Sequence, residues 1–234
     1  MIYDKYIKDD GTLFRRLLNY RNQLARATEF EFVAFANNFV EIINQEVPEE
    51  CTVNYGTSFT NESRYFIQGE PVTAVEAIQI SENYFSLFPM TVTTGRCFES
   101  SDFGIQNSEF IPIVMGGSYS ELYHIGDTFE GYYICERRKF KVIGFTDNES
   151  VFYLSSKNSL ESYKNYIIMP FENPIDDTFY ARAVQLQQIC GFVIPQTNRD
   201  TTLQAIHDCL QNAGLPEWAD AIVVNEKCLR KKLN

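Results

Sequence analysis

The sequence predicts an α+β fold in which both ends of the chain form one layer and the middle of the chain is inserted between them. Apolar residues recur at helical spacing near each end, whereas the stretch from about 80 to 170 contains mostly β-prone runs bounded by turn residues. The 234 residues are 44% hydrophobic and 15% aromatic, which is enough to fill a core. Helical ends and a strand-rich middle are typical of an α+β protein.

The first third begins with a predicted amphipathic helix. Leu17 and Leu24 fall on one face of a helix over 12–28, while arginines occupy other faces. Aromatic residues alternating with other side chains predict a strand over about 30–36. The next stretch, 39–45, fits either a strand or a short helix. Two further β-prone runs predict short strands at 51–57 and 64–68, and a third strand is expected at 77–80, at the end of the imperfectly alternating stretch 72–80.

The middle third opens with one helical turn over 82–87, and the hydroxyl of Ser81 is placed to cap it. The apolar run 111–115 predicts a strand that is buried on both faces. A hairpin is expected to follow, with arms at 128–135 and 139–146 that are joined by a charged turn at 136–138. A strand is expected at 91–94 and a short helix at 118–123. A loop-like insertion with little structure is expected at 147–165, followed by a strand at 166–169.

The last third is predicted to contain a strand, a helix and a final strand. The strand covers 183–193, and the amphipathic helix covers 200–213. N-cap candidates at 197–200 and the stop signal at Gly214 set the limits of that helix. The final strand is expected at 219–224.

Charge and hydropathy exclude two classes of function. The formal net charge of −11 repels phosphate backbones, so a nucleic-acid partner is not expected. The longest apolar runs are far shorter than the roughly 18 residues that a membrane helix needs. The chain opens with mixed charges and no apolar signal-peptide core. We therefore expect either a cytosolic protein or a piece of a larger one.

No catalytic, cofactor-binding or metal-ligating residue is predicted, and the substrate-binding residues are unknown. The two histidines, His124 and His207, are expected on the surface or on a helix face. Neither has a cysteine partner at metal-site spacing, and no phosphate-binding glycine loop is present. Most of the six cysteines are expected to be buried thiols, and their disulfide state stays open; they are Cys51, Cys97, Cys135, Cys190, Cys209 and Cys228.

An ordered series of aromatic, glycine and apolar residues runs through the middle of the chain. Each part has a structural explanation, because glycines allow turns, apolar runs fill a core and Arg96 can pair with Glu99 or Asp102 across a bend. The series consists of Tyr84-Phe85, Gly95-Arg96, Phe98, Asp102, Ile111 to Val114, Tyr119 to Tyr123, Gly126-Asp127-Thr128, Val142-Ile143-Gly144-Phe145 and Tyr166 to Pro170.

In order and approximate spacing, this series resembles the MacB-type periplasmic core domain of FtsX-like ABC transporter permeases. The resemblance covers about 80–170 well and the flanks by element order alone. It implies a discontinuous α+β (porter-like) subdomain built from 1–80 plus 171–234. It also implies an inserted β-rich (sabre-like) subdomain over 81–170. The sequence departs from the family pattern in its 147–165 insertion and in its high aromatic content.

The resemblance also implies a function. The chain would be the extracytoplasmic domain of a permease in the cell membrane, without cofactor or catalysis of its own. Its partners would be the membrane helices of the same permease, a cytoplasmic ATPase subunit and a second permease copy. Candidate substrates are a peptide, an antibiotic or a lipoprotein. The alternatives are a stand-alone extracellular ligand- or peptide-binding module and, third, a hydrolase with an unfamiliar site.

Overall fold

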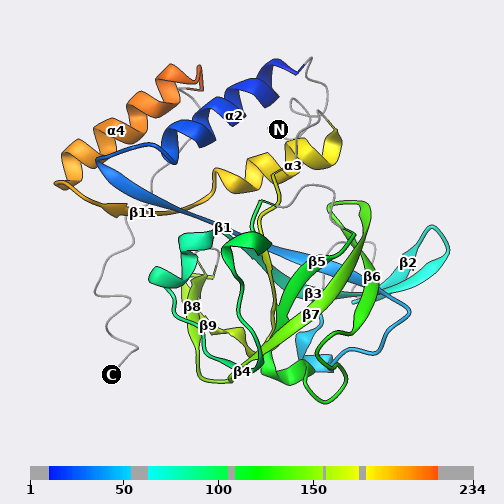
Figure 1. Cartoon of the computed structure of the whole chain (residues 1–234). Coiled ribbons are helices and arrows are strands. Elements are labelled where there is room, and N and C mark those ends of the chain that lie inside the picture. Colours follow the sequence, from blue (N-terminus) through cyan, green and yellow to red (C-terminus); the bar gives the residue numbers. More distant parts are fainter. Residues whose placement is uncertain (1–10, 54–62, 105–108, 155–156, 174–177, 216–234) are drawn as a thin grey trace. The chain divides into compact units, whose positions relative to one another are not determined.

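Helices and strands are segregated along the chain, as the sequence predicts for an α+β fold (Figure 1). The computed structural model describes residues 11–53, 63–104, 109–154, 157–173 and 178–215. Within these ranges it contains three α-helices and eleven strands, so the predicted fold class is confirmed. The chain divides into two units. Unit 1 is Met1–Ala36 with Asn173–Asn234, and unit 2 is Asn37–Glu172.

Unit 1 contains the three α-helices: α2 (Thr12–Leu24), α3 (Phe179–Gln188) and α4 (Arg199–Asn212). The first part of β1 (Phe30–Ile43) pairs antiparallel with β11 (Gly191–Pro195). Helix α2 packs against both other helices. Segments from the two ends of the chain thus build this unit together.

The core of unit 1 forms where α2 meets α4. Leu17, Tyr20 and Leu24 are spaced three and four residues apart, so they share one face of α2. They cluster with Phe30 of β1 and Leu210 of α4, all of them buried. The amphipathic helix predicted over 12–28 is therefore present, and it ends at Leu24.

Unit 2 is built on one main sheet, which takes in the second part of β1. Its strands follow the order β1-β6-β7-β5-β10-β3-β2, and β4 adds to β7. A further pairing between β1 and β3 closes six of these strands into a ring, which removes their free edges. The other strands are β2 (Arg64–Ile67), β3 (Glu70–Ile80), β4 (Val92–Gly95), β5 (Ile111–Met115), β6 (Thr128–Tyr133), β7 (Glu136–Thr146), β8 (Val151–Leu154), β9 (Ser159–Ser162) and β10 (Ile167–Pro170).

The two most apolar strands, β5 and β10, are neighbours in this sheet. Strand β5 runs parallel to β7 and antiparallel to β10, and four of its five residues are buried. The prediction of a strand buried on both faces at 111–115 is therefore confirmed. Strand β10 runs parallel to β3, and all four of its residues are buried. The 147–165 insertion has more structure than expected, since β8 and β9 pair as a hairpin.

The strand predicted over 183–193 is wrong. Most of this stretch belongs to helix α3, and only Gly191 onward is β11. The alternating run from Ala183 imitates a strand, but the Thr178 hydroxyl accepts a hydrogen bond from Ala181 N and starts a helix upstream. Once begun, the helix buries Tyr180, Val184 and Gln188 at helical spacing.

Two local predictions in unit 2 are also wrong. The charged residues 136–138 belong to β7, and the hairpin turns at Ile134 and Cys135, whose φ angles are 49° and 62°. A two-residue turn with positive φ at both positions matches the twist of the flanking strands, although it does not suit an isoleucine. Ser81 does not cap the following turn, because its hydroxyl bonds the side chain of Asn83.

Other predicted elements are present only in part or lie outside the described residues. The ambiguous stretch 39–45 is mainly the end of β1. The short strand expected from Cys51 is reduced to a 3₁₀ turn and a single bridge at Thr52, with 54–57 outside the described residues. The helix expected at 118–123 is a 3₁₀ turn, Gly117–Tyr119. The final strand at 219–224 also lies outside the described residues.

The observed division of the chain differs from the expected one at the first boundary. Residues 37–80 were expected to group with the chain ends, but they belong to unit 2. The reason is strand pairing, because β3 hydrogen-bonds to β10 and the second part of β1 pairs with β6. The second boundary, between Glu172 and Asn173, lies close to the expected one at 170/171.

Candidate functional site

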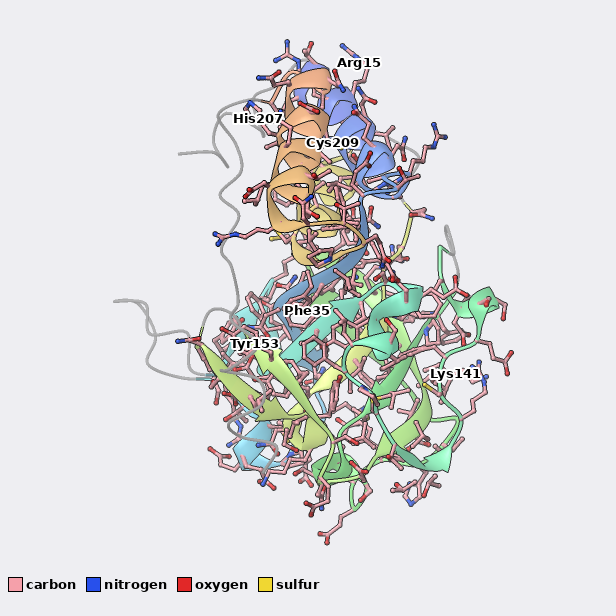
Figure 2. All side chains as sticks on the ribbon, turned by 90° about the vertical axis from the view of Figure 1, so that its left-hand side faces the viewer. Arg15, Phe35, Lys141, Tyr153, His207 and Cys209 are labelled. Carbon is pink, nitrogen blue, oxygen red and sulfur yellow. The ribbon has the colours of Figure 1, made fainter. Side chains whose placement is uncertain are left out.

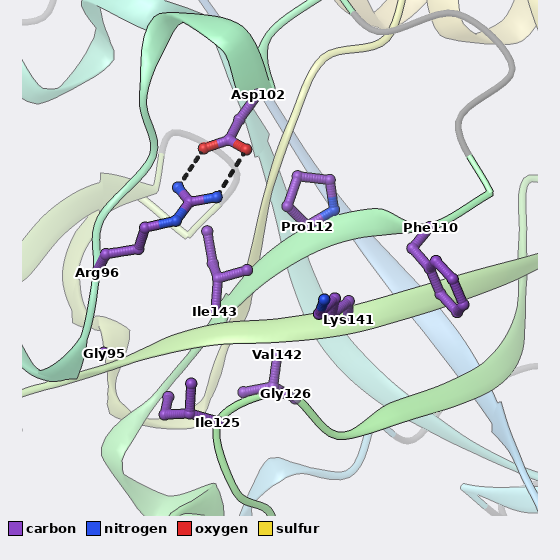
Figure 3. A pocket seen from close by; sticks show the side chains of 10 residues that line it. All are labelled: Gly95, Arg96, Asp102, Phe110, Pro112, Ile125, Gly126, Lys141, Val142 and Ile143. Carbon is purple, nitrogen blue, oxygen red and sulfur yellow. Dashed lines mark hydrogen bonds and ion pairs between the residues drawn. The ribbon is translucent and has the colours of Figure 1, made fainter.

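The residues of the sequence motif gather around one open pocket of unit 2, with a volume of about 620 Å³ (Figure 3). The pocket has an apolar lining and three charged side chains. Its lining residues are Gly95, Arg96, Asp102, Phe110, Pro112, Ile125, Gly126, Lys141, Val142 and Ile143. Seven of them belong to the family-like series, so the structure brings together what the sequence spreads over about fifty residues.

Two glycines let β4 and β7 approach closely at one side of the pocket. Gly95 has a φ of 81°, and a Cβ built there would lie 2.3 Å from the carbonyl oxygen of Ile143. A Cβ at Gly144 would lie 2.4 Å from the carbonyl oxygen of Arg96. The approach is fixed by a hydrogen bond from Arg96 N to Ile143 O of 2.9 Å. Only glycine fits at these two positions.

Arg96 and Asp102 form a two-point ion pair above the pocket. Arg96 Nη1 lies 2.5 Å from Asp102 Oδ2, and Arg96 Nη2 lies 3.0 Å from Asp102 Oδ1. Of the two partners predicted for Arg96, Asp102 is thus the one that binds it. Asp102 Oδ2 also accepts a hydrogen bond from Glu99 N at 2.8 Å. Burial opposes ionisation of Asp102, but these hydrogen bonds outweigh it and lower the pKa of the carboxyl group.

The opposite side of the pocket is a tight turn. Asp127 Oδ2 accepts a hydrogen bond from His124 N at 2.8 Å, and Gly126 N donates to Val142 O at 2.9 Å. Gly126 has a φ of 92° with open space around it. The turn places Ile125 at the pocket, where this large apolar residue stays 45% exposed.

Sequence reasoning did not single out the cation of the pocket, Lys141. It lies on the solvent-exposed side of β7, on which Arg137 and Lys139 precede it at every second position. Figure 3 shows Lys141 beside Pro112 and Phe110. The sequence signal for Lys141 was the occurrence of basic residues at every second position of a predicted strand, because such residues lie on one face of a sheet.

Among the residues that the structure describes, neither histidine forms a catalytic arrangement with a nucleophile. The side chain of His124 is 80% exposed, with Nδ1 3.6 Å from Asp127 Oδ2. His207 lies on the exposed face of α4, where Nε2 is 2.8 Å from Gln211 Nε2 (Figure 2). Within the described ranges, no group of three or more His, Cys, Asp or Glu side chains could hold a metal ion.

The prediction that most cysteines are buried is wrong for the five that the structure describes, all of which are free thiols. Only Cys51 is buried, and its burial raises the pKa of the thiol to about 11. Cys97 and Cys209 are half-buried, and Cys135 and Cys190 are exposed. Cys228 lies outside the described residues. None of the helices in the described part of the chain is long and apolar enough to cross a membrane.

Comparison with known proteins finds similarity in structure alone. No family model matches the sequence, and no curated protein matches it. The chain is similar to the periplasmic region of MacB from Actinobacillus actinomycetemcomitans, with 13% identity, a TM-score of 0.46 and coverage of 92% of this chain and 81% of that one. It is also similar to the extracellular domain of the noncanonic ABC-type transporter YknZ from Gram-positive bacteria, with 13% identity, a TM-score of 0.41 and coverage of 83% and 82% respectively.

Proposed function

We propose that this chain is the non-catalytic extracytoplasmic domain of an ABC transporter permease. In this proposal a separate cytoplasmic ATPase hydrolyses ATP, and the domain transmits the resulting movement to a substrate outside the membrane. The observation that carries the proposal is the family-like series itself. Its members Gly95, Arg96, Asp102 and Gly126 meet Val142–Phe145 at one place in unit 2.

The contacts of these residues support a mechanical role. Arg96 and Asp102 satisfy each other, and Gly95 and Gly144 allow backbone contacts that any larger residue would prevent. Such residues make a stiff connection between segments, and they leave no nucleophile or base free for chemistry. A closely packed domain is hardly compressible, so a displacement at one end moves the other end as well, as a coupling domain requires.

The full-length gene provides the first test. We expect an apolar span of about 20 residues directly before residue 1 and another after residue 234, because a permease domain of this kind lies between two membrane helices. A gene for an ATPase should be adjacent. A complete gene with neither span would overturn the proposal and favour the stand-alone binding module.

The second test measures movement in the full-length permease, reconstituted with its ATPase in lipid bilayers. Phe66, which is 73% exposed on β2, is changed to Cys and spin-labelled after Cys135 and Cys190 have been replaced by Ser. We expect the distance distribution between the labels of two permease copies to differ between the nucleotide-free and the vanadate-trapped states. ADP alone serves as the control and should cause no change. Identical distributions in the trapped and free states would contradict coupling.

A further inference from the structure

The exposed face of β7 carries a row of three cations, and two of them face carboxylates. Arg137 forms ion pairs with Glu70 at 2.9 Å and with Glu130 at 2.5 Å. Lys139 lies directly across from Glu130 in the register of β6 and β7, and its Nζ is 5.8 Å from the ring centroid of Phe110. These two positions follow the usual pattern in which opposite charges lie across from each other on neighbouring strands.

Lys141 departs from this pattern. Its neighbour on β6 is Thr128 and its neighbour on β5 is Pro112, so no carboxylate lies across from it on either side. Among the residues that the structure describes, Lys141 forms no ion pair. What distinguishes Lys141 from Lys139, which also forms no ion pair with a described residue, is that a carboxylate lies across from Lys139 on β6 and none lies across from Lys141.

The other two charges of the pocket compensate each other. Arg96 and Asp102 form the two-point pair described above, so Lys141 leaves the lining with one uncompensated positive charge. The surroundings of this charge are apolar: Phe110, Pro112, Ile125, Val142 and Ile143. The volume of about 620 Å³ falls in the range of pockets that bind small molecules.

An apolar wall beside a single free cation fits one class of ligand. The apolar part of such a ligand would cover Ile125 and Pro112 and remove their surface from water. Its anionic group would pair with the ammonium group of Lys141, and the apolar surroundings would strengthen this pair compared with one in open water. A ligand with only one of these two features would gain only one of these contributions.

We propose that this pocket binds a carboxylate carried on an apolar group. Two sources share this chemistry: a fatty acid, and the C-terminus of a peptide that ends in an apolar residue. The inference goes beyond the proposed function, because the pocket would bind such a ligand whether or not the chain belongs to a permease.

The test uses the 234-residue chain and two pairs of probes. One pair is octanoate and octanamide, and the other is N-acetyl-Ala-Ala-Leu with a free or an amidated C-terminus. Dissociation constants are measured by titration calorimetry or by NMR chemical-shift titration at millimolar concentrations. We expect the acid of at least one pair to bind about five- to tenfold more tightly than its amide, a ratio that corresponds to about 1–1.4 kcal/mol and to the loss of one hydrogen bond at an open site. The pair that shows this difference identifies the source.

Two variants locate the binding. Lys141→Gln should weaken binding of the acid about five- to tenfold, to the level of the amide, by the same reasoning. Lys157→Gln removes one positive charge outside the pocket, near Glu76 and Glu161, and should leave binding unchanged. Both lysines are exposed, so both variants should keep the wild-type melting temperature.

Three outcomes would overturn the proposal. The first is absence of saturable binding for both acids, and the second is equal affinity for the acid and its amide in both pairs. The third is an equal loss of binding in Lys141→Gln and Lys157→Gln, which would indicate a general charge effect. Acetate provides a further check, since binding of acetate as tight as that of octanoate would show that the apolar lining takes no part.

Discussion

The two units of this protein are stabilised by different means. In unit 1, helices bury apolar faces, and side chains at their N-termini satisfy free backbone groups: Thr178 starts α3 and Asn198 starts α4. In unit 2, backbone segments approach so closely at Gly95, Gly116 and Gly144 that a Cβ there would collide with a backbone carbonyl group, and unit 1 has a contact of this kind at Gly191. A helical layer tolerates many side chains that preserve its apolar face, whereas close backbone contacts admit a single residue type.

This difference matters for how each unit responds to substitution. Apolar faces can repack, so single surface changes in unit 1 should have small and local effects. Backbone contacts cannot repack without moving a segment, so changes at Gly95, Gly116 and Gly144 should have large effects. The three predictions below test this contrast.

The largest effect is expected for Gly95→Ala. The added methyl group would meet Ile143 O at 2.3 Å, and alanine would also be strained at a φ of 81°, so we expect a loss of about 3 kcal/mol or more in the free energy of unfolding. Gly126→Ala is the matched control, because Gly126 has a φ of 92° but nothing within 4 Å of the added atom. It should cost only about 1 kcal/mol from the backbone strain.

Urea denaturation of both variants provides the measurement, with the midpoint compared at constant slope. Hydrogen exchange then assigns the loss, which should fall on amides of unit 2. Equal destabilisation by Gly95→Ala and Gly126→Ala would contradict the role given to the close approach of β4 and β7.

A middle-sized effect is expected for Asp102→Asn, which weakens the bonds from Arg96 and Glu99 N. We expect a loss of about 2 kcal/mol near neutral pH, since hydrogen bonds to a charged group are worth about 1.5–3 kcal/mol. The pKa of Asp102 is lowered in the folded state. Its ionised form therefore stabilises the fold above the unfolded pKa of about 3.9, and this stabilisation is lost as the pH falls through the folded pKa.

The difference in unfolding free energy between wild type and Asp102→Asn should therefore stay level from about pH 7 to about pH 5 and shrink as the pH falls below about 4, as measured by urea denaturation from about pH 7 to about pH 2. Arg96→Met serves as the control background, because Asp102→Asn should cost less once the guanidinium is absent. A difference that is constant across this pH range would show that Asp102 does not stabilise unit 2 through its charge.

The smallest effect is expected in unit 1, for Asn198→Ala. The Asn198 side chain accepts a hydrogen bond from Thr201 N at 2.9 Å at the start of α4, and its loss should cost about 1 kcal/mol. Asn198→Asp keeps an acceptor at this position and should retain most of the stability. Thermal denaturation followed by circular dichroism measures both variants. A loss as large as that of Gly95→Ala would remove the contrast between the two units.

The sequence predicted elements whose signals are local. Helix α4 was predicted to within a residue at each end, because apolar spacing, N-cap candidates and Gly214 all agree. The buried strand at Ile111–Met115 was predicted because an uninterrupted apolar run suits no exposed position. The pair of Arg96 with Asp102 was one of two alternatives, since both candidate carboxylates lie within six residues of Arg96.

Other features could not be predicted because distant residues decide them. Alternation at 183–193 is compatible with a strand, and packing of α3 against α2 acts together with the Thr178 cap to favour a helix. The turn at Ile134 and Cys135 contains no typical turn residue, so the pairing of β6 with β7 imposes it. The isolation of Lys141 depends on the register of β7 with both of its neighbours, which the order of residues along the chain does not reveal.

The sequence by itself therefore determined the α+β class, most of the strands of unit 2 and the family-like series of glycines, apolar residues and Arg96 with Asp102. These features follow from spacing and residue type within a few positions. Only the tertiary structure decided that β1 and β3 close the sheet, that residues 37–80 join unit 2 and that the series surrounds a pocket with Lys141. Pairing between strands far apart in the chain sets all three, and a single sequence carries no local signal for such pairing.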